Sequence, residues 1–91
     1  MRVEQHWMTV GISSPFSVLF SGPPMTRNAR EALRLAGISV VRCYPRVTPD
    51  GEMRDDYRVT VDARDAESAC TKVRRTVESH GAYWGFSPDV Q

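Results

Sequence analysis

The sequence of 91 residues predicts one α+β domain whose elements follow the order β-α-β-β-α-β. Three observations lead to this prediction: two segments with apolar residues at helical spacing, a hairpin signal between them, and a short apolar or aromatic run at each end of the series. Two β-α-β halves of this kind build a four-stranded antiparallel sheet with both helices on one face.

The clearest helix spans residues 65–81. Its apolar residues recur at spacings of three and four, which places them on one stripe: Ala66, Ala69, Cys70, Val73 and Val77. Asp65 is a good N-cap, and Gly81 is expected to end the helix.

The second predicted helix spans residues 26–37 and ends at Gly37. Its apolar face is formed by Ala29, Ala32, Leu33 and Ala36. Thr26 can serve as its N-cap. Asn28 can also do so, because Glu31 follows three residues later as in a capping box, and the helix would then be shorter.

The segment Thr48-Pro49-Asp50-Gly51-Glu52 between the two helices indicates a tight hairpin, with a type I turn and Gly51 in the left-handed conformation. The turn pairs Thr48 with Glu52. Counting outward predicts three further pairs: Val47 with Met53, Cys43 with Tyr57, and Val41 with Val59.

The outer strands are predicted at residues 17–21 and 82–86, and the complete series is the ferredoxin-like topology. Residues 1–91 are expected to form one domain. Residues 1–16 are left open, either as an extension with a strand of its own or as the first half of one long strand kinked at Pro15.

Composition limits the class of protein. The formal net charge is +1, and no run of about 18 apolar residues exists, so we expect a cytoplasmic protein without a membrane span. Cys43 and Cys70 lie on the apolar phase of their elements and are expected to be buried free thiols. All but one of the 12 cationic side chains is arginine, as a GC-rich genome would produce, and an actinobacterial or phage regulator would fit.

The motifs of catalysis and metal binding are missing from this sequence. Its histidines and cysteines do not have the close spacing of metal motifs: His6, Cys43, Cys70 and His80. Residues 21–26, SGPPMT, hold one glycine, two prolines and no lysine, which does not suit a phosphate loop. We therefore expect a protein that is not an enzyme and has no metal or cofactor.

The aromatic residues are expected to lie in the core or in a subunit contact: Trp7, Tyr83, Trp84 and Phe86. A base-stacking platform would need aromatic residues on the two central strands. The third strand instead offers Arg58 and Thr60 outward.

The hairpin register predicts an unusual surface, because it sets Arg42 opposite Arg58 and Arg46 opposite Arg54. Tyr44 and Asp56 form the pair between them. Like charges directly opposite each other destabilise a sheet, so these two pairs need a reason. Asp56 and the solvent can screen the arginines, or an anionic partner can bind them: a phosphate backbone, an acidic protein surface or carboxylates of a second subunit.

Two segments, EALRLAGISVVRCYPRV at residues 31–47 and DAESACTKVRRTVE at residues 65–78, resemble ACT-type regulatory domains in their order of elements. The resemblance implies a dimer and a ligand loop between the first strand and the first helix. Ser21 and Gly22 occupy that loop here, and Gly22 is the position that matches the family pattern.

The function expected from these features is a small non-catalytic binding or regulatory module. It would act through protein contacts on its sheet face, as a homodimer. The alternative is a nucleic-acid-binding protein that contacts phosphates through the arginines. A sensor of small ligands, as in ACT-type domains, is third.

Overall fold

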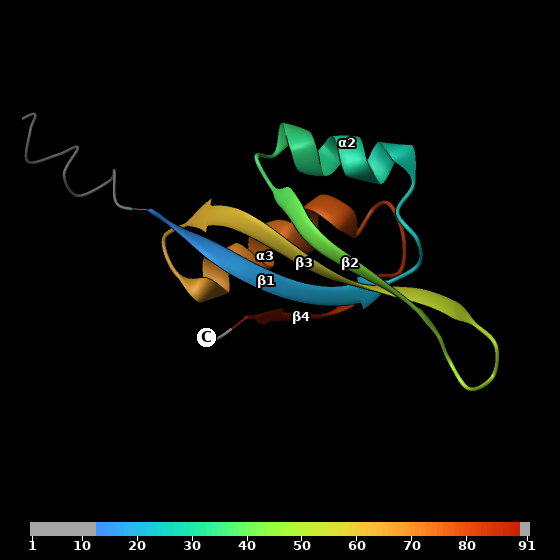
Figure 1. The fold of residues 1–91 in the computed structure, drawn as a ribbon. Coiled ribbons are helices and arrows are strands. Elements are labelled where there is room, and N and C mark those ends of the chain that lie inside the picture. The colour runs from blue at the N-terminus through green and yellow to red at the C-terminus, as the bar shows by residue number, and fades with distance from the viewer. Residues whose placement is uncertain (1–12, 90–91) are drawn as a thin grey trace, which may run out of the picture.

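The computed structural model describes residues 13–89 and shows four strands and two helices in the predicted order (Figure 1). The elements are β1 (Ser14–Gly22), α2 (Arg27–Leu35), β2 (Ser39–Val47), β3 (Met53–Ala63), α3 (Ala66–Val77) and β4 (Trp84–Pro88). The strands form one antiparallel sheet in the order β2-β3-β1-β4. The α+β class and the ferredoxin-like topology are confirmed.

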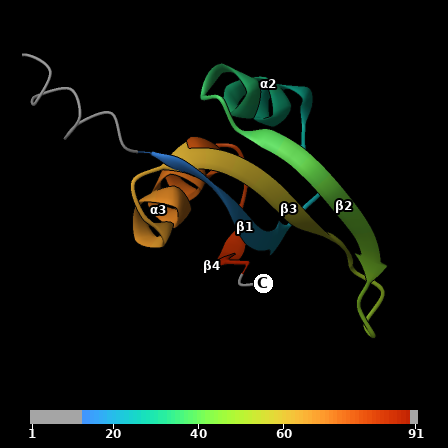
Figure 2. The ribbon, with the colours of Figure 1, turned by 60° about the vertical axis from the view of Figure 1, so that its left-hand side comes forward.

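Both helices lie on one side of the sheet (Figures 1 and 2). The core between the two layers is apolar and contains no buried polar or charged residue among residues 13–89. Alternate residues of the central strands point into it: Val18 and Phe20 from β1, and Tyr57, Val59 and Val61 from β3. No described element covers the other side of the sheet, which we call the open face.

The helix starts follow the capping chemistry in the sequence. The Thr26 hydroxyl accepts a hydrogen bond of 3.1 Å from the backbone N–H of Ala29, so Thr26 and not Asn28 is the N-cap of α2. The Asp65 carboxylate accepts one of 2.7 Å from the N–H of Ser68 at the start of α3. Both helices end earlier than expected.

The hairpin between β2 and β3 has the predicted turn. Gly51 has a φ of 89°, and the N–H of Thr48 donates to the Glu52 carbonyl at 2.8 Å. The predicted register is confirmed from Val47–Met53 to Cys43–Tyr57 and as far as Arg42–Arg58. The pairing of Val41 with Val59 is wrong, because a bulge between Val40 and Arg42 sets Val40 opposite Val59.

The outer strands differ from the boundaries expected from the sequence. β1 begins at Ser14, before Pro15, and pairs along its whole length with β3, from Ala63 to Asp55. Ser14, Pro15 and Phe16 therefore belong to β1, while residues 1–12 of the predicted N-terminal extension lie outside the described residues. β4 begins two residues later than expected.

Candidate functional site

The predicted arginine surface exists on the open face. β2 and β3 place its six residues on one side of the hairpin in three cross-strand pairs: Arg42 with Arg58, Tyr44 with Asp56, and Arg46 with Arg54. We call these six residues the arginine face. Residues that alternate with them, such as Tyr57, point to the helices.

Asp56 is at the centre of the arginine face and compensates the pair nearest the turn. Its carboxylate accepts hydrogen bonds of 2.7 Å from the Ser21 hydroxyl on β1 and 2.7 Å from Arg46 Nη1. Arg54 Nε lies 3.7 Å from Oδ1 of the same carboxylate. The Ser21 hydroxyl, followed by Arg46, lowers the pKa of Asp56. One carboxylate therefore holds two opposed arginines together.

The pair farther from the turn is compensated on one side. Arg58 Nη2 lies 2.8 Å from the carboxylate of Asp89, which follows β4. The Asp89 N–H donates to the Ser17 carbonyl at 2.8 Å. Arg42, in contrast, has no ion pair within residues 13–89 and is exposed. Arg42 is therefore the one arginine of the arginine face that has no carboxylate partner among the described residues.

Arg54 is held against an aromatic ring that the sequence pattern did not place on this face. Its guanidinium carbon lies 5.9 Å from the centroid of Trp84, in the range of a cation–π contact. Arg54 Nε is buried and has no hydrogen-bond acceptor among the described residues. Arg54 also lines a hollow of about 410 Å³ on the open face, with Leu19, Tyr44 and Arg58.

Trp84 and Leu19 extend the surface onto β4 and β1. Trp84 is 47% exposed and pairs with Ser21, while Phe86 points the other way and stacks on Phe20 at 5.1 Å. A register shift in the β1–β4 pairing accompanies Gly85, whose φ is 76°. The signal in the sequence was the glycine between two aromatic residues, since an isolated glycine in a strand often marks a bulge.

Ser21 and Gly22, which the resemblance assigns to a ligand loop, are instead the last two residues of β1, paired with Asp56 and Asp55 of β3, and are engaged by contacts within the chain. Ser21 donates to Asp56, and a Cβ added at Gly22 would lie 2.2 Å from Cδ1 of Tyr83. The Pro23 carbonyl accepts a hydrogen bond of 2.8 Å from Tyr57. These contacts close the loop over the end of the core.

The expectation of two buried thiols is wrong for Cys43, which is exposed, and Cys70 is half-buried. The reason for Cys43 is its position on edge strand β2, where every residue from Val41 to Val47 is exposed. Its Sγ lies 3.5 Å from Asp55 Oδ2, and desolvation, followed by the charge of Asp55, raises the pKa of the thiol.

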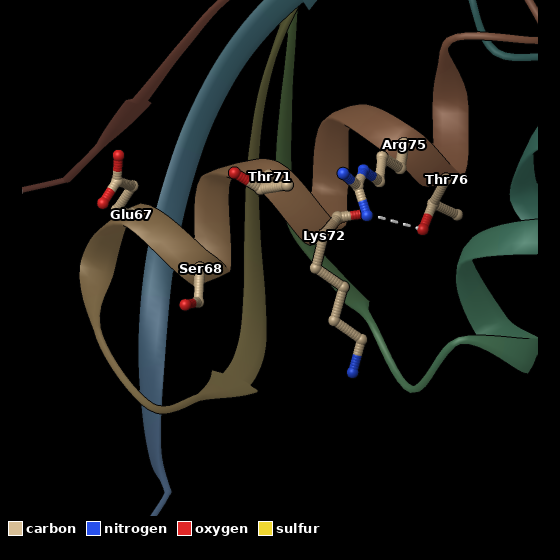
Figure 3. Close-up of a pocket in the computed structure, with 6 residues that line it drawn as sticks. All are labelled: Glu67, Ser68, Thr71, Lys72, Arg75 and Thr76. Atoms are coloured by element: carbon tan, nitrogen blue, oxygen red, sulfur yellow. Dashed lines mark hydrogen bonds between the residues drawn. The ribbon is translucent and has the colours of Figure 1, made fainter.

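A second hollow, of about 500 Å³, lies along α3 on the side away from the core (Figure 3). Its lining consists of hydrophilic side chains of that helix: Glu67, Ser68, Thr71, Lys72, Arg75 and Thr76. The Thr76 hydroxyl donates to the Lys72 carbonyl at 2.8 Å. No described side chain from another element faces them, so this surface lacks the opposed walls of a binding pocket.

Within residues 13–89, no helix is both long and apolar enough to span a membrane. No three histidine, cysteine or acidic side chains among residues 13–89 gather as ligands for a metal ion.

Replacing Asp56 with asparagine is expected to lower the free energy of unfolding at pH 7 by about 1 to 2 kcal/mol, because charge-assisted hydrogen bonds are lost and Arg46 and Arg54 repel each other. Folding lowers the pKa of Asp56, so its ionised form stabilises the fold above its unfolded pKa of about 3.9. This contribution declines as the pH falls through the lower folded pKa.

Urea denaturation of both proteins from pH 7 to pH 2 measures the difference. The gap between wild type and Asp56→Asn should be constant above about pH 5 and should close below the folded pKa. A gap that is unchanged at pH 2 would contradict the assigned role of the carboxylate.

Comparison with known proteins adds the fold alone. No family model and no curated protein matches the chain. Among solved structures it is similar to an unknown protein from Galdieria sulphuraria, with a TM-score of 0.52 and 13% sequence identity. The match covers 88% of this chain and 47% of the other, so the chain spans less than half the length of that protein.

Proposed function

We propose that this chain is a non-catalytic protein-binding module, and that it forms a homodimer through the open face of its sheet. The observation that supports this most is the composition of that face. Tyr44 and Trp84 are about half exposed there, at 50% and 47%, and are interleaved with the arginines. Tyrosine, tryptophan and arginine are the residues enriched at the centres of protein interfaces.

The free edge of β2 is a less suitable contact than the face. The hydrogen bond from Thr48 to Glu52 fixes the pattern of the hairpin ladder, so that odd-numbered residues near the turn direct their N–H groups away from β3. Pro45 is one of these residues and has no N–H to donate. A strand that paired with this edge would find no backbone N–H donor at the middle of β2.

Nucleic-acid binding is the competing function, and the four arginines support it. Three of them, Arg46, Arg54 and Arg58, lie within 4 Å of a carboxylate of the same chain, which reduces the positive field at the surface. Binding that neutralised about four phosphates of duplex DNA would make the binding constant fall as the salt concentration rises. A plot of the logarithm of the binding constant against the logarithm of the salt concentration would have a slope of about −3.6.

A sensor of small ligands of the ACT type is less well supported. Ser21 and Gly22, the loop positions that the resemblance assigns to a ligand, are occupied by Asp56 and by the ring of Tyr83. A ligand at this loop would have to displace contacts of the core.

Sedimentation velocity tests the proposed dimer. The 91-residue chain should be dimeric at micromolar concentration, and Tyr44→Ala should weaken the dimer about 30-fold, as expected for an interface tyrosine worth about 2 kcal/mol. Leu35→Ala on α2 is the matched control, because Leu35 is also exposed and apolar but lies on the helical layer. A monomer at about 200 µM, well above the micromolar Kd of a standard interface, would refute the dimer. DNA binding with the stated salt slope would favour the competing function.

A further inference from the structure

The hairpin extends past the rest of the sheet. β1 ends at Gly22, which pairs with Asp55, so the turn end of the hairpin continues as a two-stranded ribbon (Figures 1 and 2). Isolated two-stranded ribbons are marginally stable in water. Val47 and Met53 are exposed on this ribbon, at 68% and 62%, on the side opposite the arginine face. The ribbon has no third strand beside it, so a partner that packs on its arginine face would stabilise it.

The charges on the open face of β3 and its turn alternate in sign at every second residue. The order is Glu52, Arg54, Asp56 and Arg58, followed by the neutral Thr60 and then Asp62. Side chains two residues apart lie on the same face of a strand, so these charges form one row. A row of alternating sign is complementary to a reversed copy of itself if the two are aligned at the right residue.

Three charges at this surface have no ion pair within residues 13–89: the carboxylates of Glu52 and Asp62 and the guanidinium of Arg42. Glu52 and Arg42 cannot meet within one chain. Arg42 is level with Arg58, and six residues of extended strand separate Arg58 from Glu52, a distance of about 20 Å. Any pairing between Glu52 and Arg42 has to be intermolecular.

We propose that the second copy lies antiparallel across the hairpin, with the two-fold axis at the Pro45–Asp55 pair, so that Glu52 meets Arg42 and Arg58 of the partner subunit. This inference rests on the proposed dimer and specifies its register. The same axis sets Arg54 over Asp56 of the partner subunit, and Tyr44 over Arg46 of the partner subunit. Charged contacts of this kind determine which register an interface adopts.

Neighbouring registers match the charges less well. An axis at Asp56 would stack Arg54 on Arg58 of the partner subunit, and an axis at Tyr57 would stack Glu52 on Asp62 of the partner subunit. An axis at Thr60 pairs Arg58 with Asp62 of the partner subunit, which is one opposite pair within β3, and leaves Glu52 without a contact. The proposed axis pairs Arg54 with Asp56 within β3 and also pairs Arg58 with Glu52, the residue before the strand.

A charge exchange tests the register. Glu52→Arg and Arg42→Glu should each weaken the homodimer at least about tenfold, because each creates like-charge contacts twice per dimer. Mixed at equal concentrations, the two variants should form a heterodimer that is tighter than the homodimer of either variant, since both contacts between positions 52 and 42 then join opposite charges. Its affinity should stay below that of wild type, because one of the two contacts between position 52 and Arg58 then joins like charges. Both side chains are exposed and lack an ion pair within residues 13–89, so we expect both variants to fold. Circular dichroism checks this.

Asp62→Arg is the matched control, with the same charge change on the same face of β3, and it should leave the dimer unchanged. Weakening by Asp62→Arg and not by Glu52→Arg would overturn the proposed register in favour of the axis at Thr60. A wild-type dimer that is sensitive to Tyr44→Ala and insensitive to the charge variants would also overturn it, while the proposed function would stand. A monomeric wild type would refute both.

Discussion

Phe20→Ala is expected to lower the free energy of unfolding by about 3 to 5 kcal/mol, the range found when a buried phenylalanine is truncated. Phe20 is 2% exposed on the central strand β1. Its ring stacks on Tyr57 at 5.0 Å and on Phe86 at 5.1 Å, and meets the edge of Tyr83 at 5.7 Å. One substitution therefore removes the contact shared by strands β1, β3 and β4.

A loss of this size is a large fraction of the total free energy of unfolding, since natural domains are stable by only about 5 to 15 kcal/mol. Urea denaturation followed by circular dichroism measures it. Leu19→Ala provides the control, because Leu19 is the adjacent residue but faces the open side and is 36% exposed. We expect a loss below about 1 kcal/mol there. Equal losses at Phe20 and Leu19 would contradict the assignment of Phe20 to the core and of Leu19 to the open face.

Gly22→Ala is the second large effect, with an expected loss of about 3 kcal/mol from overpacking. The new Cβ would lie 2.2 Å from Cδ1 of Tyr83. The ring cannot move away freely, because it packs edge-on against Phe20 and Tyr57. Gly22 does not have a positive φ, so the cost comes from the contact and not from the backbone.

A double-mutant cycle separates this contact from other causes. In a Tyr83→Ala background the ring is absent, and Gly22→Ala should then cost less than about 1 kcal/mol. Thermal or urea denaturation of the four proteins provides the coupling energy. If alanine at position 22 costs the same with and without the ring, the close approach to Tyr83 is not the reason for glycine at this position.

Both of these substitutions act on the layer between the sheet and the helices, whereas the variants that test assembly lie on the open face. Tyr44, Glu52 and Arg42 are exposed, and we expect their substitution to change assembly more than stability. This separation lets binding and folding be measured independently. It follows from the alternation of side chains along β1, β2 and β3.

Local signals in the sequence were sufficient for much of the candidate site. The turn at residues 48–52 has residues that favour one turn type, and a turn of known length determines which residues pair on both sides of it. For this reason the pairs of the arginine face, including Tyr44 with Asp56, follow from the residues of the turn and simple counting along the two strands. The N-cap at Asp65 likewise depends on residues close in the sequence, because its carboxylate bonds the N–H of Ser68.

Other features depended on partners that are distant in the chain. The exposure of Cys43 depends on the place of β2 at the edge of the sheet, and the ion pair of Arg58 depends on Asp89 returning beside β1. The side on which Trp84 lies depends on the register shift between β1 and β4. The first two relations have no signal within a few residues of the side chain concerned, whereas the bulge beside Trp84 has one in the adjacent Gly85.

The sequence by itself determined the order of elements, the hairpin register up to the bulge, and the alternation of charge along β3, because each follows from turn chemistry and from the two-residue period of a strand. Tertiary structure alone decided which arginines are compensated, where the ribbon loses the support of β1, and that Trp84 holds Arg54. These depend on contacts between strands that are far apart in sequence, and such contacts form only when the sheet is assembled.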